Sequence, residues 1–256
     1  MYEQERTRDP IARIALVIAL ACVAGMVVAV PSVLPPKLRE LVGLNAERLA
    51  DPRTAGPGGS YAFLEVQPGD PDEPVGYDPC EPIRLVINDD QAPEDGEQLV
   101  LDAMEHVEDV TGLRFSYEGT TDEPPRSSDS GAVVLAGGEV KAPPALVSWA
   151  DEDVVDDLKG DVAGIGGSAS VGTRGRQRYV TGSITLDADL FDDLMDDGDG
   201  GRDEARAIVL HEFGHLLGLD HVHDGAELMN EENFGLLDYG KGDLNGLAKL
   251  GAIPCD

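Results

Sequence analysis

Basic residues are scarce in this chain of 256 residues, where 19 lysines and arginines stand against 50 aspartates and glutamates. The formal net charge is therefore −31 at pH 7. A surface of that sign repels phosphate backbones, so the composition argues against nucleic acid as a partner. The same charge keeps a protein soluble and also suits it to high salt, and the sequence alone leaves both interpretations open.

Cysteine is also rare, with only three in the chain. Cys22 falls in an apolar run near the N-terminus, which leaves Cys80 and Cys255 for the rest of the protein. Two thiols in an oxidising compartment are expected to pair. In the chain-entropy model so long a loop contributes roughly 4 to 5 kcal/mol to the free energy of unfolding. We therefore predict a disulfide between Cys80 and Cys255; the alternative is two separate free thiols.

The N-terminus carries a long apolar run, because residues 14–30 contain no charged side chain. Residues 1–13 before it include Arg6, Arg8 and Arg13, and a basic start followed by an apolar run is typical of an export signal. We predict a cytoplasmic segment at 1–13 and a transmembrane signal-anchor at 14–30. The predicted location is the cell membrane, with a single pass and an exported C-terminal domain. Cleavage of the apolar run, which would give a secreted protein, is the alternative.

Residues 31–76 are rich in proline, glycine and charge and keep no sustained helical or alternating period. Such a composition is typical of a linker, so we predict a stalk here. The folded domain is expected to span residues 77–256, and it contains no internal repeat.

Hydrophobic spacing along the domain indicates strands and helices in turn. The order is strand, helix, several strands and then two helices, which predicts an α+β domain with a mixed sheet. The expected strands lie at 83–87, 113–117, 133–135, 145–149, 161–171 and 183–186, and the expected helices at 94–110, 203–219 and 243–250.

Histidine is rare as well, yet three of the five histidines lie in the stretch HEFGHLLGLDH at residues 211–221. His211 and His215 are four residues apart, so on a helix both imidazoles project from one face and can share a metal ion. His221 can join them only if the helix ends first. Gly218 stands between, and glycine ends a helix in a left-handed conformation at little cost. Three neutral nitrogens leave a fourth position open, as in a catalytic zinc site.

Glu212 directly follows the first of these histidines. On a helix its side chain points about 100° away from His211, beside the open position. A carboxylate there can take the proton of a water whose pKa a metal has lowered, and can return it to a leaving amine. The residues therefore predict peptide hydrolysis with Glu212 as general base and acid.

The stretch HEFGHLLGLDH resembles the HExxHxxGxxH signature of the metzincin metalloproteases at every specified position. Met229 stands where the matrixins, one metzincin group, carry the methionine of their Met-turn, and Asp224 stands at the matrixin aspartate. The resemblance covers roughly residues 77–256. Residues 160–167 (GDVAGIGG) look like the matrixin edge strand that pairs with substrate backbone.

This resemblance implies a zincin-like catalytic domain with a mostly parallel, twisted mixed sheet of about five strands and three helices. It implies a zinc endopeptidase acting on proteins or peptides, with Zn²⁺ bound by His211, His215 and His221. Met229 would then form an apolar floor under the metal. A non-catalytic extracellular binding module, which keeps zinc only to stabilise its fold, is the alternative.

The chain departs from the matrixin pattern after Met229. The proline-bearing segment that forms the wall of the S1′ pocket is replaced by NEENFGLLDYG, residues 230–240. Its large side chains are the candidates for that wall, namely Phe234, Leu236, Leu237 and Tyr239. No Pro-Arg-Cys-Gly motif precedes the domain, so latency through a pro-segment thiol is not expected.

Calcium is a second metal that the resemblance raises, because matrixins bind structural calcium. Asp192, Asp193 and the stretch DDGDGGRD at 196–203 are acidic and glycine-rich, although their spacing fits no EF-hand. Acidic residues are also favourable at the N-terminus of a helix, which would account for them without calcium. Both interpretations, a calcium site and a favourable helix start, stay open.

Overall fold

The structure is a computed structural model that describes residues 48–255, apart from 54–55, 128–130, 132, 135–139, 174 and 233–234. Residues 48 onward form one compact unit. The predicted segments at 1–13 and 14–30 lie outside the described residues.

The predicted single-pass membrane location needs correction. Within the part of the chain that the structure describes, no helix combines the length and the apolar character needed to cross a bilayer. The structure therefore gives the predicted single-pass membrane location no support.

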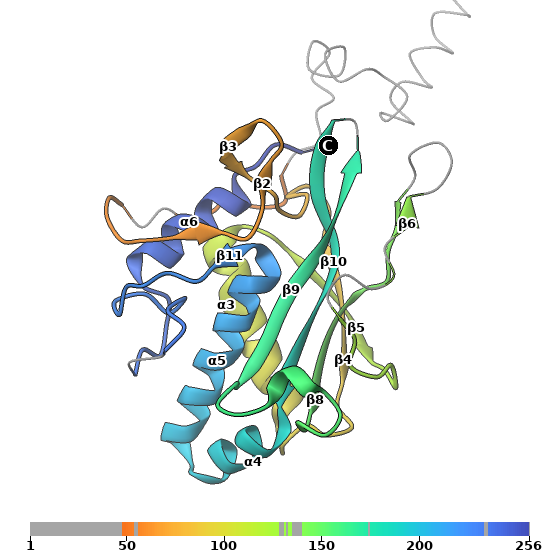
Figure 1. Cartoon of the computed structure of the whole chain (residues 1–256), viewed down its shortest axis with the longest axis vertical. Coiled ribbons are helices and arrows are strands. Elements are labelled where there is room, and N and C mark those ends of the chain that lie inside the picture. Colours follow the sequence, from red (N-terminus) through yellow and green to blue (C-terminus); the bar gives the residue numbers. More distant parts are fainter. Residues whose placement is uncertain are drawn as a thin grey trace, which may run out of the picture. The chain divides into compact units, whose positions relative to one another are not determined.

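A five-stranded sheet forms the centre of the fold, with the strand order β5-β4-β8-β10-β9 (Figure 1). The first four of these strands are parallel to their neighbours, whereas β9 pairs with β10 in the antiparallel direction. The prediction of an α+β fold with a mixed, mostly parallel sheet is thus confirmed. The strands are β4 Ile83–Asn88, β5 Phe115–Thr120, β8 Ala145–Ala150, β9 Gly164–Thr173 and β10 Arg176–Asp187.

The described residues form four α-helices where three were predicted: α3 Gly96–Thr111, α4 Ala188–Asp196, α5 Asp199–Leu217 and α6 Lys241–Gly251. The helix that the sequence analysis missed is α4, a short and acidic segment that directly follows strand β10. Asp187 caps it, because its carboxylate accepts a hydrogen bond from the N–H of Leu190. A 3-10 turn, η2 Asp156–Leu158, and a two-stranded hairpin, β6 Val133–Val134 with β7 Val140–Lys141, lie between β5 and β9.

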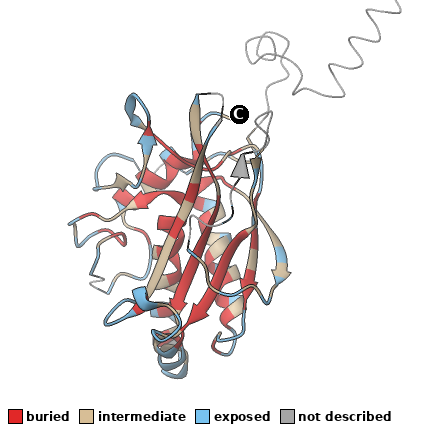
Figure 2. Ribbon diagram, turned by 45° about the vertical axis from the view of Figure 1, so that its right-hand side comes forward, coloured by how far each residue is buried: buried red, intermediate tan, exposed pale blue. Residues whose placement is uncertain are grey.

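The core lies between the sheet and the two long helices. Figure 1 shows α3 and α5 side by side on one side of the sheet, and Figure 2 shows that their buried residues face its strands. Val147 and Trp149 of β8 and Leu210 and Phe213 of α5 are among the buried core residues. The ring of Phe213 packs edge-on against Phe115 of β5. These contacts hold α5, which carries the first two histidines of the motif, firmly against the sheet.

The domain begins before residue 77, so the predicted boundary is too late. Three short strands form within the expected stalk: β1 Ala62–Phe63, β2 Val66–Gln67 and β3 Asp70–Pro74. Earlier still, the guanidinium of Arg48 donates hydrogen bonds to backbone carbonyls at the end of α6. Two of these strands have only two residues, and β3 consists of the polar and proline-bearing stretch DPDEP, so none of them shows a hydrophobic period and the region resembled a linker.

Residues 60–64, which we call the N-terminal strap, lie beside the segment that leads to His221. Strand β1 pairs with β11, Leu219–Asp220, and the N–H of Leu64 donates to the carbonyl of Gly218 at 2.9 Å. At the other end of the strap the N–H of Ser60 donates to Oε1 of Glu227 at 3.2 Å. The strap therefore braces the chain on both sides of the third histidine.

Deleting the strap is expected to destabilise the domain. Relative to a chain that begins at Arg48, a chain that begins at residue 65 should lose about 1 to 3 kcal/mol of unfolding free energy, because Glu227 and Gly218 lose backbone donors. A chain that begins at residue 58 keeps the strap and is the matched control. Urea denaturation measures all three proteins, and equal midpoints for the two shorter chains would contradict a bracing role.

Candidate metal centre

Helix α5 carries His211 and His215 one turn apart and ends just after them. Its last residue is Leu217, and Gly218 follows with φ 120°. The N–H of Gly218 donates to the carbonyls of Gly214 and His215, each at 3.1 Å. A Cβ at this position would lie 2.9 Å from the ring of Tyr179, so both conformation and space require glycine. The chain turns here, and His221 comes back toward the helix.

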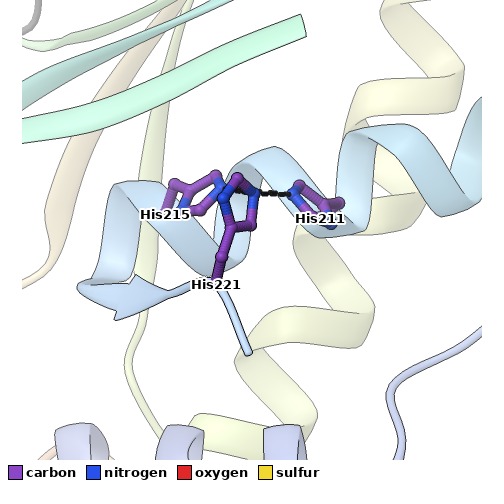
Figure 3. A group of neighbouring side chains, drawn as sticks. All are labelled: His211, His215 and His221. Carbon is purple, nitrogen blue, oxygen red and sulfur yellow. Dashed lines mark hydrogen bonds between the residues drawn. The ribbon is translucent and has the colours of Figure 1, made fainter. Parts of the chain in front are cut away.

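The three imidazoles converge on one point. Figure 3 shows the rings of His211, His215 and His221 directed toward one another. Their Nε2 atoms are 3.1 Å apart between His211 and His215 and 3.0 Å apart for the other two pairs. Nitrogens bound at ~2.0 to 2.1 Å to a tetrahedral metal stand roughly 3.3 Å from one another. The triad is therefore geometrically able to hold one metal ion.

Backbone carbonyls determine how two of these rings are protonated. Nδ1 of His211 lies 2.7 Å from the carbonyl oxygen of Leu228, and Nδ1 of His215 lies 2.8 Å from that of Leu219. A carbonyl oxygen only accepts, so each Nδ1 carries the proton and each Nε2 presents a lone pair to the centre. Burial lowers the pKa of both His211 and His215 to about 4, so both rings are neutral at pH 7. Lone pairs facing one another at this distance repel unless a cation lies between them, so the donor set fits a metal ion.

Glu212 is buried beside the triad, with 5% of its surface exposed. Its Oε2 atom has no hydrogen-bond partner among the described residues, and burial raises the pKa of this carboxyl to about 8. Strand β9 lies close against Glu212. A Cβ on Gly164 would come within 2.9 Å of the Glu212 side chain, and a Cβ on Gly166 would come within 2.5 Å of the backbone carbonyl oxygen of Glu212. The glycines of β9 thus let the edge strand lie directly beside this carboxylate.

Met229 packs against α5 at Gly214, between the two helical histidines. Its side chain is buried, and its carbonyl accepts the N–H of Val222 at 2.9 Å. A Cβ on Gly214 would overlap the sulfur of Met229. The glycine between the two helical histidines therefore leaves room for the thioether on the helix surface, where the sequence analysis expected an apolar floor.

A cleft of about 640 Å³ is lined by the three histidines and Glu212. Its walls also include residues 161–166 and further apolar residues, among them Leu64, Leu190, Ile208 and Leu228. The rim is acidic, with the carboxylates of Asp161, Asp220, Glu204, Glu231 and Glu232. Glu231 also lies 3.8 Å from Nδ1 of His221.

Three of the four predicted wall residues do not line the cleft. Leu236, Leu237 and Tyr239 are not among the residues that line the cleft, and Phe234 lies outside the described residues. Tyr239 is buried, and its hydroxyl donates to the carbonyl of Leu210 at 2.5 Å. The apolar residues of the cleft come from several elements, among them α4, α5 and the strap. Ile208 could have been found from the sequence, since it lies one helical turn before the motif; Leu190 could not, because α4 was missed.

The remaining site predictions concern a disulfide and a calcium ion. The structure pairs Cys80 with Cys255, with Cα atoms 5.7 Å apart, as the sequence analysis expected. Within the described ranges, only two groups of three or more side chains come close enough to share a metal ion, the triad and one around this disulfide. The acidic residues at 192, 193 and 196–203 form no such group among the described side chains.

No family model matches the chain, and no curated protein was found to match it. The chemistry of this centre therefore has to be argued from its own residues.

Proposed function

We propose that this protein is a zinc-dependent metalloendopeptidase with a metzincin-type, matrixin-like catalytic domain. One observation carries the proposal: three imidazoles present Nε2 atoms 3.0 to 3.1 Å apart in a cleft that the buried carboxylate of Glu212 also lines. The HExxHxxGxxH motif and the α+β fold with a mostly parallel sheet support it further.

In this proposal His211, His215 and His221 hold the zinc ion through Nε2. Two of the rings are neutral and kept in the correct tautomer by backbone carbonyls, which is what a nitrogen ligand requires. When bound by these three residues, zinc would polarise a substrate carbonyl and lower the pKa of a water molecule to about 7.

Glu212 transfers the proton of the attacking water in this proposal. Its unpartnered Oε2 atom is an acceptor beside the triad, with no competing donor among the described residues. We assign this carboxylate to take the proton of the attacking water and to return it to the nitrogen of the leaving amine. Burial in the cleft keeps bulk water from competing for the same oxygen.

A peptide is the substrate that best fits the cleft. Strand β9 is at the edge of the sheet, and its first residues, 164–166, line the cleft beside Glu212. An extended peptide can add to such an edge through backbone hydrogen bonds. The apolar side chains of Leu190, Ile208 and Leu228 then receive an apolar side chain of the substrate.

Removing the metal tests the proposal. The purified protein should contain about one zinc ion per chain and cleave members of a peptide library. Treatment with 1,10-phenanthroline should reduce cleavage to background, because the histidines and Glu212 cannot activate water without the ion. Adding zinc back should restore the activity. Full cleavage by metal-free protein would refute the proposal.

The same assay separates the alternative of a zinc-stabilised binding module. Such a module would hold the metal and cleave no peptide. The unpartnered, buried oxygen of Glu212 favours the enzyme, because a carboxylate kept only for stability would be expected to have hydrogen-bond donors.

A further inference from the structure

Leu64, at the end of the strap, is an exposed leucine that lines the cleft. Its side chain is uncovered, since 42% of the residue is exposed, but its backbone is fixed on both sides. Its N–H donates to the carbonyl of Gly218, and the carbonyl of Glu65 accepts the N–H of Val75 at 3.0 Å. Scattered exposed leucines are ordinary on a protein surface. A leucine held at a fixed place in a cleft is preorganised for a ligand, because no backbone has to be ordered on binding.

The pairing of the strap explains why this leucine stays uncovered. Phe63 lies opposite Leu219 in the register of β1 with β11, and both pack in the core. Side chains alternate along a strand, so Leu64 points to the other face, the face of Asp220, which also lines the cleft. Continuing the register places Leu64 opposite Gly218, to which its N–H donates. Glycine has no side chain that could cover it.

Leu64 lies at the opposite end of the cleft from the apolar residues of α4 and α5. Ile208 comes about one helical turn before His211, whereas Leu64 lies beside Gly218, just after the last turn of α5. At 1.5 Å per residue, Ile208 and Gly218 are roughly 15 Å apart along the helix axis. The three histidines lie between these two ends.

Strand β9 follows α5 from one end to the other (Figure 1). Gly166 lies against the backbone of Glu212, and the hydroxyl of Ser168 donates to the carbonyl of Leu216 at 2.6 Å. A peptide extended along β9 therefore passes both ends of the cleft. At ~3.3 Å per residue, about four or five residues of such a peptide span the distance.

We propose that Leu64 is a specificity-determining residue, which receives an apolar side chain of the substrate on the far side of the metal centre from Leu190 and Ile208. The substrate class is then peptides with a large apolar residue on each side of the cleaved bond. Contact with Leu64 removes apolar surface of both partners from water, which favours binding. The inference rests on the endopeptidase function proposed above.

The first test is a set of three fluorogenic peptides. One is a peptide that the parent cleaves, with an apolar residue on each side of the bond, and in each of the others serine replaces one of these two residues. The parent should lose about tenfold or more in kcat/KM for either replacement. Leu64→Ser should keep the loss for one replacement and reduce the other to less than about twofold, because serine offers no apolar surface.

Two variants serve as controls. Val66→Ser makes a similar change at a residue that is 39% exposed and does not line the cleft, so it should leave both preferences unchanged. Leu64→Met keeps an apolar side chain of similar volume and should retain the preference that Leu64→Ser loses. Unchanged preferences in Leu64→Ser, or equal reductions at both positions, would overturn the inference. An apolar preference of the parent on one side only would overturn it without any variant.

Binding without cleavage separates this inference from the proposed reaction. The dissociation constant of a fluorescently labelled form of the first peptide, from anisotropy with Glu212→Gln, should rise about tenfold when Leu64→Ser is added and not with Val66→Ser. A parent that binds the peptide through Leu64 but cleaves none would refute the enzyme and leave this subsite standing. Cleavage that is insensitive to Leu64 would do the reverse. A parent that neither binds nor cleaves peptides would refute both.

Discussion

Replacing Glu212 with glutamine should reduce peptide cleavage by a factor of about 10³ or more while zinc stays bound, because general acid–base catalysis contributes ~10² to 10⁴. The amide cannot take a proton from water at neutral pH, whereas the three histidine ligands are unchanged. The fold should also be retained. Oε2 has no hydrogen-bond partner among the described residues, so the substitution breaks no hydrogen bond of that oxygen with them. The measurements are kcat/KM on a cleaved peptide and zinc content on the same sample.

Glu204→Gln is the control for this result. Glu204 lines the same cleft on the same helix, but its side chain is exposed on the rim. This substitution makes the same carboxyl-to-amide change and should alter kcat/KM by less than about threefold, since exposed charges are screened by solvent. Unchanged cleavage by Glu212→Gln would exclude the assigned mechanism. Equal losses in both variants would show that the charge of the cleft, rather than one proton acceptor, is what matters.

Replacing Gly218 with alanine should cost about 2 to 4 kcal/mol of unfolding free energy, from a positive φ and from overpacking. The added Cβ would lie 2.9 Å from the ring of Tyr179 and 3.2 Å from the carbonyl oxygen of Val75. Relief of either contact moves the turn that brings His221 to the other two histidines. Zinc affinity should therefore fall together with stability. Urea denaturation and chelator competition measure the two effects.

Gly200→Ala is the matched control, because Gly200 lies near the start of the same helix with nothing within 4 Å of its Cβ position. Alanine there should stabilise the protein by about 0.5 to 1 kcal/mol, since it lowers the entropy of the unfolded chain without a clash. If Gly218→Ala were as stable as the parent, the turn would not require glycine, and the explanation of how His221 reaches the site would fail.

The sequence predicted the parts of this protein that depend on neighbours in the chain. The spacing of His211 and His215, the end of the helix at Gly218 and the place of Glu212 follow from helix geometry and from the conformational freedom of glycine. The α+β fold follows from the order of the periodic segments, and the confirmed mixed sheet shows that these local signals were sufficient.

Contacts between distant segments decided the rest. The strap at 60–64 and the cleft wall from α4 join residues that leave no common pattern in the sequence. For this reason the domain boundary at 77 and the count of three helices were predicted wrongly, and Leu236, Leu237 and Tyr239 do not line the cleft. Local periodicity determines which elements form, but the packing of side chains far apart in the chain determines which of them surround the three histidines.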